Sequence, residues 1–246
     1  MALLWGGLPR WQQVKAAKEG LDNIMQPPTE NQREETPIRQ DVLRGHYLFE
    51  QAQFAYGGDV QNPALRINRL EIKPGEHVAI LGRNGAGKST LLQAMVGSMD
   101  LVGGELRLDN LSLPHLDMAD VRRNVGLMSQ NARLFYGTLR ENITLGMPRA
   151  TDDEIFAVLE MCGAAAFVQK LAKGLDHQIM ENGVGLSGGQ RQSILLARMF
   201  LRDPNIVLLD EPTASLDEHT EREFIQRLSQ WLGNRTLIVA THRVPM

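Results

Sequence analysis

The sequence predicts an α/β fold with a mostly parallel sheet, a small antiparallel β layer and an inserted helical region. Four short segments are almost wholly apolar and are each followed by turn or polar residues: 77–81, 125–128, 206–209 and 236–240. Such runs are typical of strands buried on both faces of a parallel sheet. The long stretch between the second and third segments has helical character, which predicts helices inserted into the α/β core.

Three further strand candidates predict the antiparallel layer. Residues 48–56 and 65–72 are separated by Gly57-Gly58-Asp59, and residues 105–108 form a third candidate. The helical insertion is expected at about residues 131–200. Within it, Thr138-Leu-Arg-Glu141 and Thr151-Asp-Asp-Glu154 have the capping-box pattern, which predicts two helix starts.

The composition is that of a globular chain and disfavours nucleic acid as a partner. The 246 residues are 43% apolar, enough for a sizeable core. With 26 Lys+Arg against 29 Asp+Glu, the net charge of -3 lacks the basic balance of nucleic-acid-binding proteins, so we expect no nucleic acid partner. The single cysteine, Cys162, permits no internal disulfide, and its apolar surroundings predict a packing role.

The N-terminal residues allow two interpretations. Residues 1–8 are apolar and are followed by Arg10, Lys15 and Lys18, whereas a signal peptide carries its positive charge before the apolar part. No run approaches the roughly 18 apolar residues that cross a bilayer. The octet is therefore either an exposed frayed end or the last turns of a truncated membrane helix.

A helix and a linker are predicted before the main domain. Apolar residues recur at helical spacing over residues 10–25, and Pro27 and Pro28 stop this helix. The polar and charged stretch 29–41 favours a linker. We therefore assign residues 1–45 to the end of a truncated membrane helix plus linker, and residues 46–246 to the main domain.

The segment 82–89 fits the phosphate-binding pattern G-x-x-x-x-G-K-[ST], with a predicted strand before it and a predicted helix after it. Glycines let the backbone N–H groups point at phosphates, and the helix N-terminus adds positive potential. Lys88 would reach the phosphates and Ser89 would ligate Mg²⁺. A chance glycine-rich turn is the alternative. The predicted nucleotide-binding residues are Gly82, Arg83, Asn84, Gly85, Ala86, Gly87, Lys88, Ser89 and Thr90.

Two acidic residues close the apolar run 206–209. Asp210 is predicted to hold Mg²⁺, directly or through water. Glu211 follows at the end of the strand, where ligands of parallel α/β sheets bind, and is the candidate general base for an attacking water. The alternative is an ordinary pair of surface acids.

A third motif lies at the start of a predicted helix that runs to Leu201, before Asp203-Pro204. Ser187 would cap this helix, and the next two residues are glycines that leave the N–H groups unencumbered, so a second anion site is predicted. The alternative is a simple helix cap after a flexible loop. The motif consists of Leu186, Ser187, Gly188, Gly189 and Gln190.

With these motifs in this order, the sequence resembles the ATPase domains of ABC transporters, whose signature motif is LSGGQ. The resemblance runs from about Phe54 to His242. It implies a P-loop NTPase core of the RecA-like type, ATP and Mg²⁺ as cofactors, and ATP hydrolysis coupled to transmembrane transport. It also implies a homodimer in which each ATP lies between the phosphate loop of one chain and the signature motif of the other.

The resemblance assigns roles to four residues that are weak signals alone. Gln130 matches the glutamine that contacts Mg²⁺ and the membrane domain, and His242 matches the histidine that contacts the γ-phosphate, so both join Glu211 as catalytic residues. Asp217 belongs to the segment that matches the D-loop. Tyr56 matches the aromatic that stacks on adenine. Without the resemblance, Gln130 is a solvated polar residue, His242 a surface group and Tyr56 a strand-packing residue.

Residues 134–143 and 181–183 resemble the exporter branch of the family, and residues 11–25 and 115–123 resemble the type I secretion ATPases of Gram-negative bacteria. This implies membrane helices before the domain, a periplasmic adaptor, an outer-membrane channel, protein export, and a place at the cytoplasmic face of the inner membrane. The apolar octet then favours the truncated membrane helix.

The chain stops four residues past His242, where family members continue, so we expect a domain truncated at its C-terminus. Alternatives remain open: an exporter of peptide or lipid, a soluble ABC ATPase without a transport role, or a nucleotide-binding regulator. Glu211 argues against a regulator that does not hydrolyse ATP.

Overall fold

The computed structural model describes residues 36–242. The predicted helix over residues 10–25 and the apolar octet lie outside the described residues. The chain divides into two units, Met1–Pro37 and Ile38–Met246, and the second carries all the elements below.

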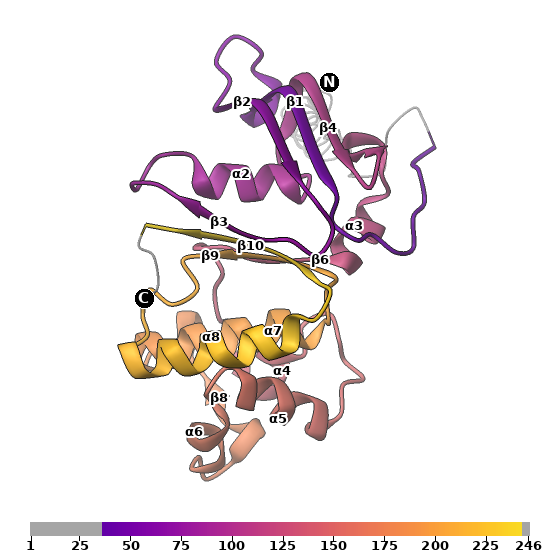
Figure 1. Ribbon diagram of the computed structural model, residues 1–246. Coiled ribbons are helices and arrows are strands. Elements are labelled where there is room, and N and C mark those ends of the chain that lie inside the picture. Colours follow the sequence, from indigo (N-terminus) through magenta and orange to yellow (C-terminus); the bar gives the residue numbers. More distant parts are fainter. Residues whose placement is uncertain (1–35, 243–246) are drawn as a thin grey trace, which may run out of the picture. The chain divides into compact units, whose positions relative to one another are not determined.

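The four apolar segments form one parallel sheet, as predicted, with the order β3-β10-β9-β6. The edge strand β3 is not buried on both faces as expected, because only Val78 and Ile80 pack on a hydrophobic cluster and the other residues of this strand are exposed. Each neighbouring pair is parallel, so the carboxyl ends of the strands meet at one edge of the sheet (Figure 1). The strands are β3 (His77–Leu81), β6 (Val125–Met128), β9 (Ile206–Asp210) and β10 (Thr236–Thr241).

A second sheet is antiparallel and has the order β2-β1-β4-β5. Its strands are β1 (Tyr47–Ala55), β2 (Leu65–Ile72), β4 (Asp100–Leu108) and β5 (Leu111–Ser112). The prediction of an antiparallel layer is thus confirmed, but β4 begins five residues before the predicted start at residue 105. The difference arises at Gly104, which has a φ of +70° and passes so close to the Gln51 carbonyl that a Cβ atom would lie 2.0 Å from its oxygen. Glycine in a sequence typically indicates a turn. Gly104 instead lets β4 continue past an irregularity in the pairing with β1.

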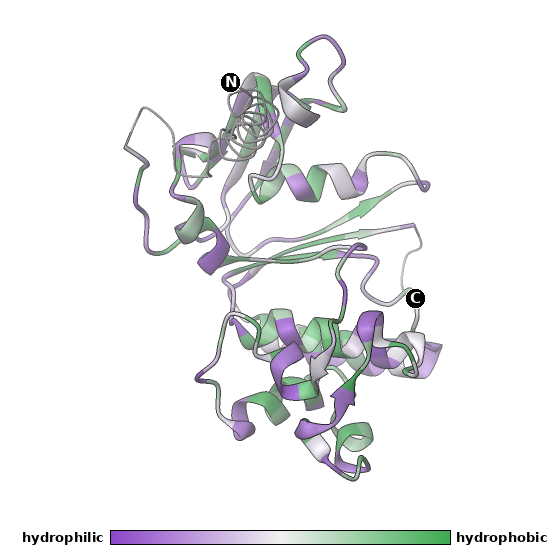
Figure 2. Cartoon of the chain, turned by 180° about the vertical axis from the view of Figure 1, so that it is seen from behind, coloured by the Kyte–Doolittle hydropathy of each residue, from purple (hydrophilic) through white to green (hydrophobic). Residues whose placement is uncertain are grey.

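The parallel sheet has a separate hydrophobic cluster on each face. Alternate residues of β9 take part in them, since Ile206 and Leu208 pack on one side and Val207 and Leu209 on the other. The first cluster joins the antiparallel sheet, α2 (Lys88–Met95) and α3 (Met118–Asn124); the second joins α7 (Gly188–Leu201) and α8 (Glu218–Leu232) (Figure 1). The hydropathy colouring accordingly shows apolar strands between these two groups of elements (Figure 2).

The helices between β6 and β9 belong to the second cluster. They are α4 (Leu139–Ile143), α5 (Asp152–Met161), α6 (Ala165–Gln169) and α7, with the short strands β7 (Gly137–Thr138) and β8 (Gln178–Ile179). Both predicted capping boxes form, at Thr138 and Thr151. Short 3-10 helices occupy Tyr56–Gly58, Leu113–His115, Gly174–Asp176 and Glu181–Gly183. Within residues 36–242, no helix has the length and apolar character to cross a bilayer.

Cys162 is buried at the end of α5, and burial raises the pKa of its thiol. It packs in the second cluster, which confirms the predicted packing role.

Residues 38–45, ahead of the expected domain start at His46, belong to the second unit. The Arg39 guanidinium donates to the Asp120 carboxylate over 2.9 Å, and the Leu43 N–H donates to Asn124 Oδ1 over 3.1 Å. Both partners lie in α3, and the Leu43 side chain is fully buried. The end of the stretch predicted as a linker is therefore hydrogen-bonded to α3, about 80 positions further along the chain.

Candidate functional site: a phosphate loop at the carboxyl edge of the sheet

The predicted phosphate loop connects β3 to α2. Gly85 and Gly87 have φ values of +80° and +90°, a left-handed backbone that glycine adopts at low cost. Gly87 is also the N-cap residue of α2, so the first N–H groups of that helix follow the loop directly. The loop therefore has the two features that bind phosphate, namely a curled backbone and a helix N-terminus.

Lys88 turns its side chain back onto this loop. Its ammonium donates to the carbonyl oxygens of Gly82 and Arg83, the latter over 2.9 Å, and the residue is buried. The charge is thereby held at the loop, where a phosphate would gain a charge-assisted hydrogen bond from it.

Asp210 ends β9 at the same edge of the sheet, and Ser89 lines the smaller of two nearby cavities together with it. Burial raises the pKa of this carboxyl, and the neighbouring Glu211 raises it further, against the opposing effects of Ser89 and Lys88. In the described part of the chain, Asp210 Oδ1 is the buried side-chain atom without a hydrogen-bond partner. A buried acceptor left unsatisfied costs about 1–3 kcal/mol, so this oxygen calls for a partner such as a cation.

The residues around this oxygen fit Mg²⁺, because the Ser89 hydroxyl and the Asp210 carboxylate are the oxygen donors that this ion prefers. No cluster of three or more His, Cys, Asp or Glu side chains suited to a metal occurs among residues 36–242. A cation here would therefore need oxygens beyond these two, of the kind that phosphates and water supply.

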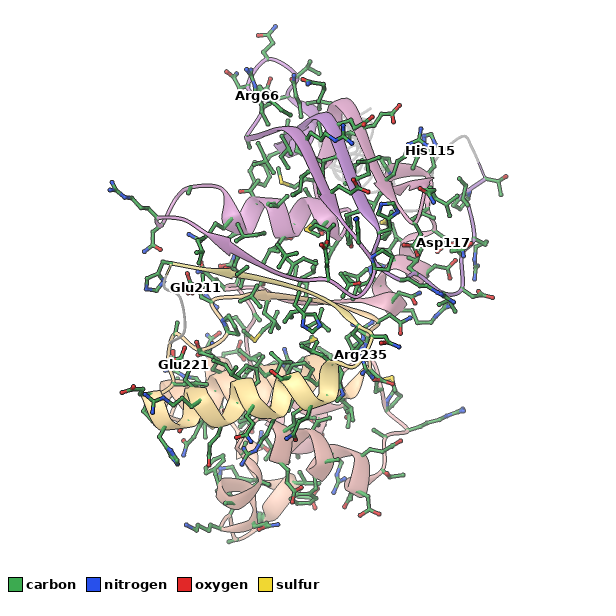
Figure 3. The ribbon with its side chains drawn as sticks, in the orientation of Figure 1. Arg66, His115, Asp117, Glu211, Glu221 and Arg235 are labelled. Atoms are coloured by element: carbon green, nitrogen blue, oxygen red, sulfur yellow. The ribbon has the colours of Figure 1, made fainter. Side chains whose placement is uncertain are left out.

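Glu211 follows Asp210 in a left-handed conformation, with a φ of +49°. That conformation costs a non-glycine residue about 1–2 kcal/mol, and a hydrogen bond of 2.9 Å from its N–H to the Ala240 carbonyl stabilises the turn. Its carboxylate accepts from the Thr241 hydroxyl over 3.2 Å and is hydrogen-bonded to His242 Nδ1 over 2.9 Å. Figure 3 shows Glu211 at the edge of the sheet where the phosphate loop begins.

Two adjoining cavities bring together nine of the predicted residues, and Gln130 and Asp210 line both. The larger, about 500 Å³, is also lined by Asn84, Gly188, Glu211 and His242. The smaller, about 310 Å³, is also lined by Tyr56, Ser89 and Thr90. Tyr56 lies in a 3-10 helix after β1 and is 65% exposed, so it is not a strand-packing residue.

The predicted cap of α7 is present. Ser187 Oγ accepts from the Gln190 N–H over 3.1 Å, and the Gln190 side chain accepts from the Ser187 N–H over 2.9 Å. A Cβ atom at Gly189 would lie 3.2 Å from the Ser215 carbonyl oxygen, so the first turn of α7 packs tightly on the segment before α8. Leu186 packs partly against the core of the α7–α8 face.

Asp217 lines neither cavity and instead caps α8. Its carboxylate accepts from the Thr220 N–H over 2.9 Å, and this bond is the main cause that lowers the pKa of Asp217. The structure thus brings Gln130, Glu211 and His242 together and leaves Asp217 at a helix start.

Comparison with known proteins decides the family. The family model described as "ABC transporter" matches residues 65–214, more than half of the chain. The chain belongs to the ABC transporter family. It is an ATP-binding domain of the exporter type, and the enzyme activity of such domains is hydrolysis of ATP, which they bind with Mg²⁺.

Three relatives of this ABC domain illustrate the similarity. It is 35% identical over 259 residues to an uncharacterized ABC transporter ATP-binding protein of Haemophilus influenzae, covering 99% of this chain and 42% of that protein. It is 40% identical over 206 residues to the ATP-dependent lipid A-core flippase of Shewanella frigidimarina, and the alignment covers 83% of this chain and 34% of the flippase. A solved structure of a bacterial Atm1-family ABC exporter with ATP bound superposes on this chain with a TM-score of 0.86 and 29% sequence identity. The superposition covers 94% of this chain and 40% of the exporter chain. The chain therefore spans less than half the length of each.

Two residues of the ABC site escaped the sequence analysis. Thr241 contacts Glu211, and the Gln192 side chain donates to the Glu211 carbonyl oxygen over 2.9 Å. Gln192 follows Gly188 by four positions, one helical turn, so a helix-face argument from the glycines would have found it. Thr241 carries no such signal, because its contact depends on two parallel strands.

Proposed function

We propose that this domain hydrolyses ATP with Mg²⁺ at sites shared by two chains, and that this reaction drives export across a membrane. The observation that carries the proposal is the Asp210 carboxyl group. One of its oxygens is buried without a partner, beside Ser89 of the phosphate loop and next to the base candidate Glu211.

The nucleotide is held by the loop between β3 and α2. Tyr56 stacks on the adenine ring, which suits its exposed side chain at the smaller cavity. The N–H groups of the loop and of the first turn of α2 bind the phosphates, and Lys88 contributes its charge. The binding residues in this assignment are Gly82, Arg83, Asn84, Gly85, Ala86, Gly87, Lys88, Ser89 and Thr90.

Ser89, Gln130 and Asp210 would hold the magnesium ion. Gln130 and Asp210 line both cavities, and Ser89 lines the smaller one with them. Bound Mg²⁺ supplies positive charge that offsets the negative charge developing on the phosphates.

Glu211 acts as the general base and accepts a proton from the attacking water. The hydrogen bond of 2.9 Å with His242 places an imidazole beside this carboxylate. We assign His242 to contact with the γ-phosphate and Gln130 to positioning the water, so that the three residues surround the reacting atoms in the larger cavity.

A second chain completes each site. The first turn of α7 presents N–H groups at Gly188 and Gly189, which carry no side chains, and this arrangement suits an anion. The residues that contact the partner's ATP are Leu186, Ser187, Gly188, Gly189 and Gln190, with Asp217 near the shared boundary. This ABC domain thus works as a homodimer.

Transport follows from differential binding. ATP favours the closed dimer and hydrolysis reopens it, which moves the membrane helices attached to each domain. The domain then lies at the cytoplasmic face of a membrane and has its own transmembrane domain as a partner.

The exported substrate has two candidate classes. The resemblance of residues 11–25 and 115–123 favours a protein exported by type I secretion, with a periplasmic adaptor and an outer-membrane channel at a bacterial inner membrane. The similarity to lipid A-core flippases favours the second class, a lipid. Deleting the gene and comparing secreted proteins with exported lipids separates the two classes. Unchanged secreted proteins would refute type I secretion without affecting the ATPase assignment.

The hydrolytic role of the site is tested by Glu211→Gln. We expect ATP binding to persist while Mg²⁺-dependent turnover falls by about 10² or more, because the base is lost and the phosphate loop is intact. The control Glu160→Gln, at an exposed position of α5, should hydrolyse ATP at the parental rate. A Glu211→Gln chain with parental turnover would refute the proposed base.

A further inference from the structure

The Gln192 side chain connects two segments of the site. Its Nε2 donates to the Glu211 carbonyl oxygen over 2.9 Å, and its Oε1 accepts from the Ser215 N–H over 3.0 Å. The carboxamide thus spans the turn that carries the general base and the segment that leads to α8.

These two bonds require both a donor and an acceptor at one position. A glutamate at residue 192 would accept from Ser215 but would have nothing to donate to the Glu211 carbonyl, and its charge would lie near Asp210 and Glu211. A lysine would donate but could not accept. The chemistry of the contact therefore selects an amide.

The turn that Gln192 holds is the one that aims the Glu211 carboxylate. Glu211 has a φ of +49°, a conformation that a non-glycine residue keeps only where its surroundings enforce it. The Glu211 N–H donates to the Ala240 carbonyl of β10, and the Glu211 carbonyl accepts from Gln192 over 2.9 Å and, more weakly, from the Ala214 N–H over 3.3 Å. Both ends of the residue are thus tied, one to the sheet and one to α7.

Gln192 lies one helical turn after the glycines that face the partner chain's ATP. Gly188 and Gly189 pack against Ser215, so the first turn of α7, the Ser215 segment and Glu211 form one contiguous set of contacts. A shift of α7 would reach the Glu211 turn through the Gln192 amide.

We propose that Gln192 is a positioning residue that ties the aim of Glu211 to the position of α7 in the same chain. Gln192 thereby holds the Glu211 turn in place for hydrolysis at its own chain's site. The inference rests on the proposed role of Glu211 as the base.

The first experiment measures turnover and ATP affinity of the full chain carrying Gln192→Glu, and of a neutral variant of similar length, Gln192→Met. We expect kcat to fall about tenfold in both, with KM for ATP and the melting temperature nearly unchanged. The control Gln226→Glu makes the same substitution at an exposed position of α8 and should keep parental kcat. Parental kcat in both Gln192 variants would overturn the inference.

The second experiment asks which chain's site is impaired. Ser187→Arg chains mixed with Glu211→Gln chains form heterodimers with one complete site, so turnover should return. Gln192→Glu chains mixed with Glu211→Gln chains should reach only about a tenth of that turnover, because Gln192 acts on Glu211 of its own chain. Equal recovery in both mixtures, with dimers verified by light scattering, would overturn the inference, since Gln192 would then act on the partner's site.

These experiments distinguish failure of the proposed base Glu211 from failure of the proposed positioning role of Gln192. If Glu211→Gln alone keeps parental turnover, the role of the base fails and the inference on Gln192 fails with it. If Glu211→Gln is inactive and the Gln192 variants are fully active, only the inference on Gln192 is lost.

Discussion

Single residues at this site are held in states that the rest of the fold must stabilise. Glu211 keeps a left-handed backbone, and Asp210 keeps a buried oxygen without a hydrogen-bond partner. Each state lowers the stability of the folded chain by itself. Such a loss of folding free energy is typical of active-site residues, because selection for stability alone would favour residues without backbone strain or unpaired polar atoms.

Lys88→Ala should weaken ATP binding at least tenfold, because the substitution removes a charge-assisted contact with the phosphates. Calorimetric titration with ATP measures the effect. The control Lys170→Ala removes a lysine at the exposed end of α6 and should bind ATP with parental affinity. Unchanged affinity in the Lys88 variant would contradict the assigned contact.

Asp210→Asn should stabilise the Mg²⁺-free chain near pH 7 and lose that advantage in acid. Burial raises the pKa of Asp210 above its ordinary 3.8. Since the folded chain keeps the proton where the unfolded chain has lost it, the free energy of unfolding falls as pH rises from 3.8 through the raised pKa. The asparagine variant lacks this fall, so its advantage grows over the same window.

Denaturant unfolding at several pH values, without Mg²⁺, measures this difference. The Asp100→Asn variant, at an exposed position, serves as the control for replacing a carboxyl group by an amide. Adding Mg²⁺ and ATP should stabilise the parent more than the Asp210 variant. A difference in unfolding free energy that does not vary with pH would contradict the burial argument.

At the scale of elements, the same local device serves different purposes. The capping boxes at Ser187 and at Thr151 have the same hydrogen-bond pattern, and each satisfies free N–H groups at a helix start. Only the first belongs to a helix whose opening turn packs on the segment before α8 and faces the larger cavity. The two helices therefore differ in function because of where they lie in the fold, and not because of their caps.

Ser187→Ala and Thr151→Ala should therefore each cost about 1 kcal/mol of unfolding free energy, but only Ser187→Ala should lower turnover, by about tenfold. Thermal unfolding and an ATPase assay on both variants provide the comparison. Equal turnover in the two variants would show that Ser187 acts only as a cap.

At the scale of the whole molecule, the proposed homodimer divides each ATP site between two chains. In this proposal, one chain supplies the phosphate loop and Glu211, and the other chain supplies the first turn of α7.

Turnover per chain should consequently rise with protein concentration, because dilution separates the dimer. ATPase assays over about a hundredfold range of concentration test this expectation, with light scattering on the same samples. A constant rate per chain in samples that are monomeric throughout would contradict the shared site.

The amino-acid sequence alone determined the strands of the parallel sheet, the phosphate loop, the helix caps and the family. These features depend on residues close together in the chain, and the spacing and chemistry of such residues predict the local structure directly. The four apolar runs and the cap at Ser187 belong to this group.

Only the tertiary structure decided the early start of β4, the attachment of Arg39 to Asp120, the capping role of Asp217, the contact of His242 with Glu211 and the bridge made by Gln192. Most of these depend on groups far apart in the chain, and their geometry follows from strand order and backbone angles. The φ of Glu211 is the clearest case. No local pattern predicts a left-handed glutamate, because its cost is offset by hydrogen bonds with two other elements, β10 and α7, that only the folded chain brings together.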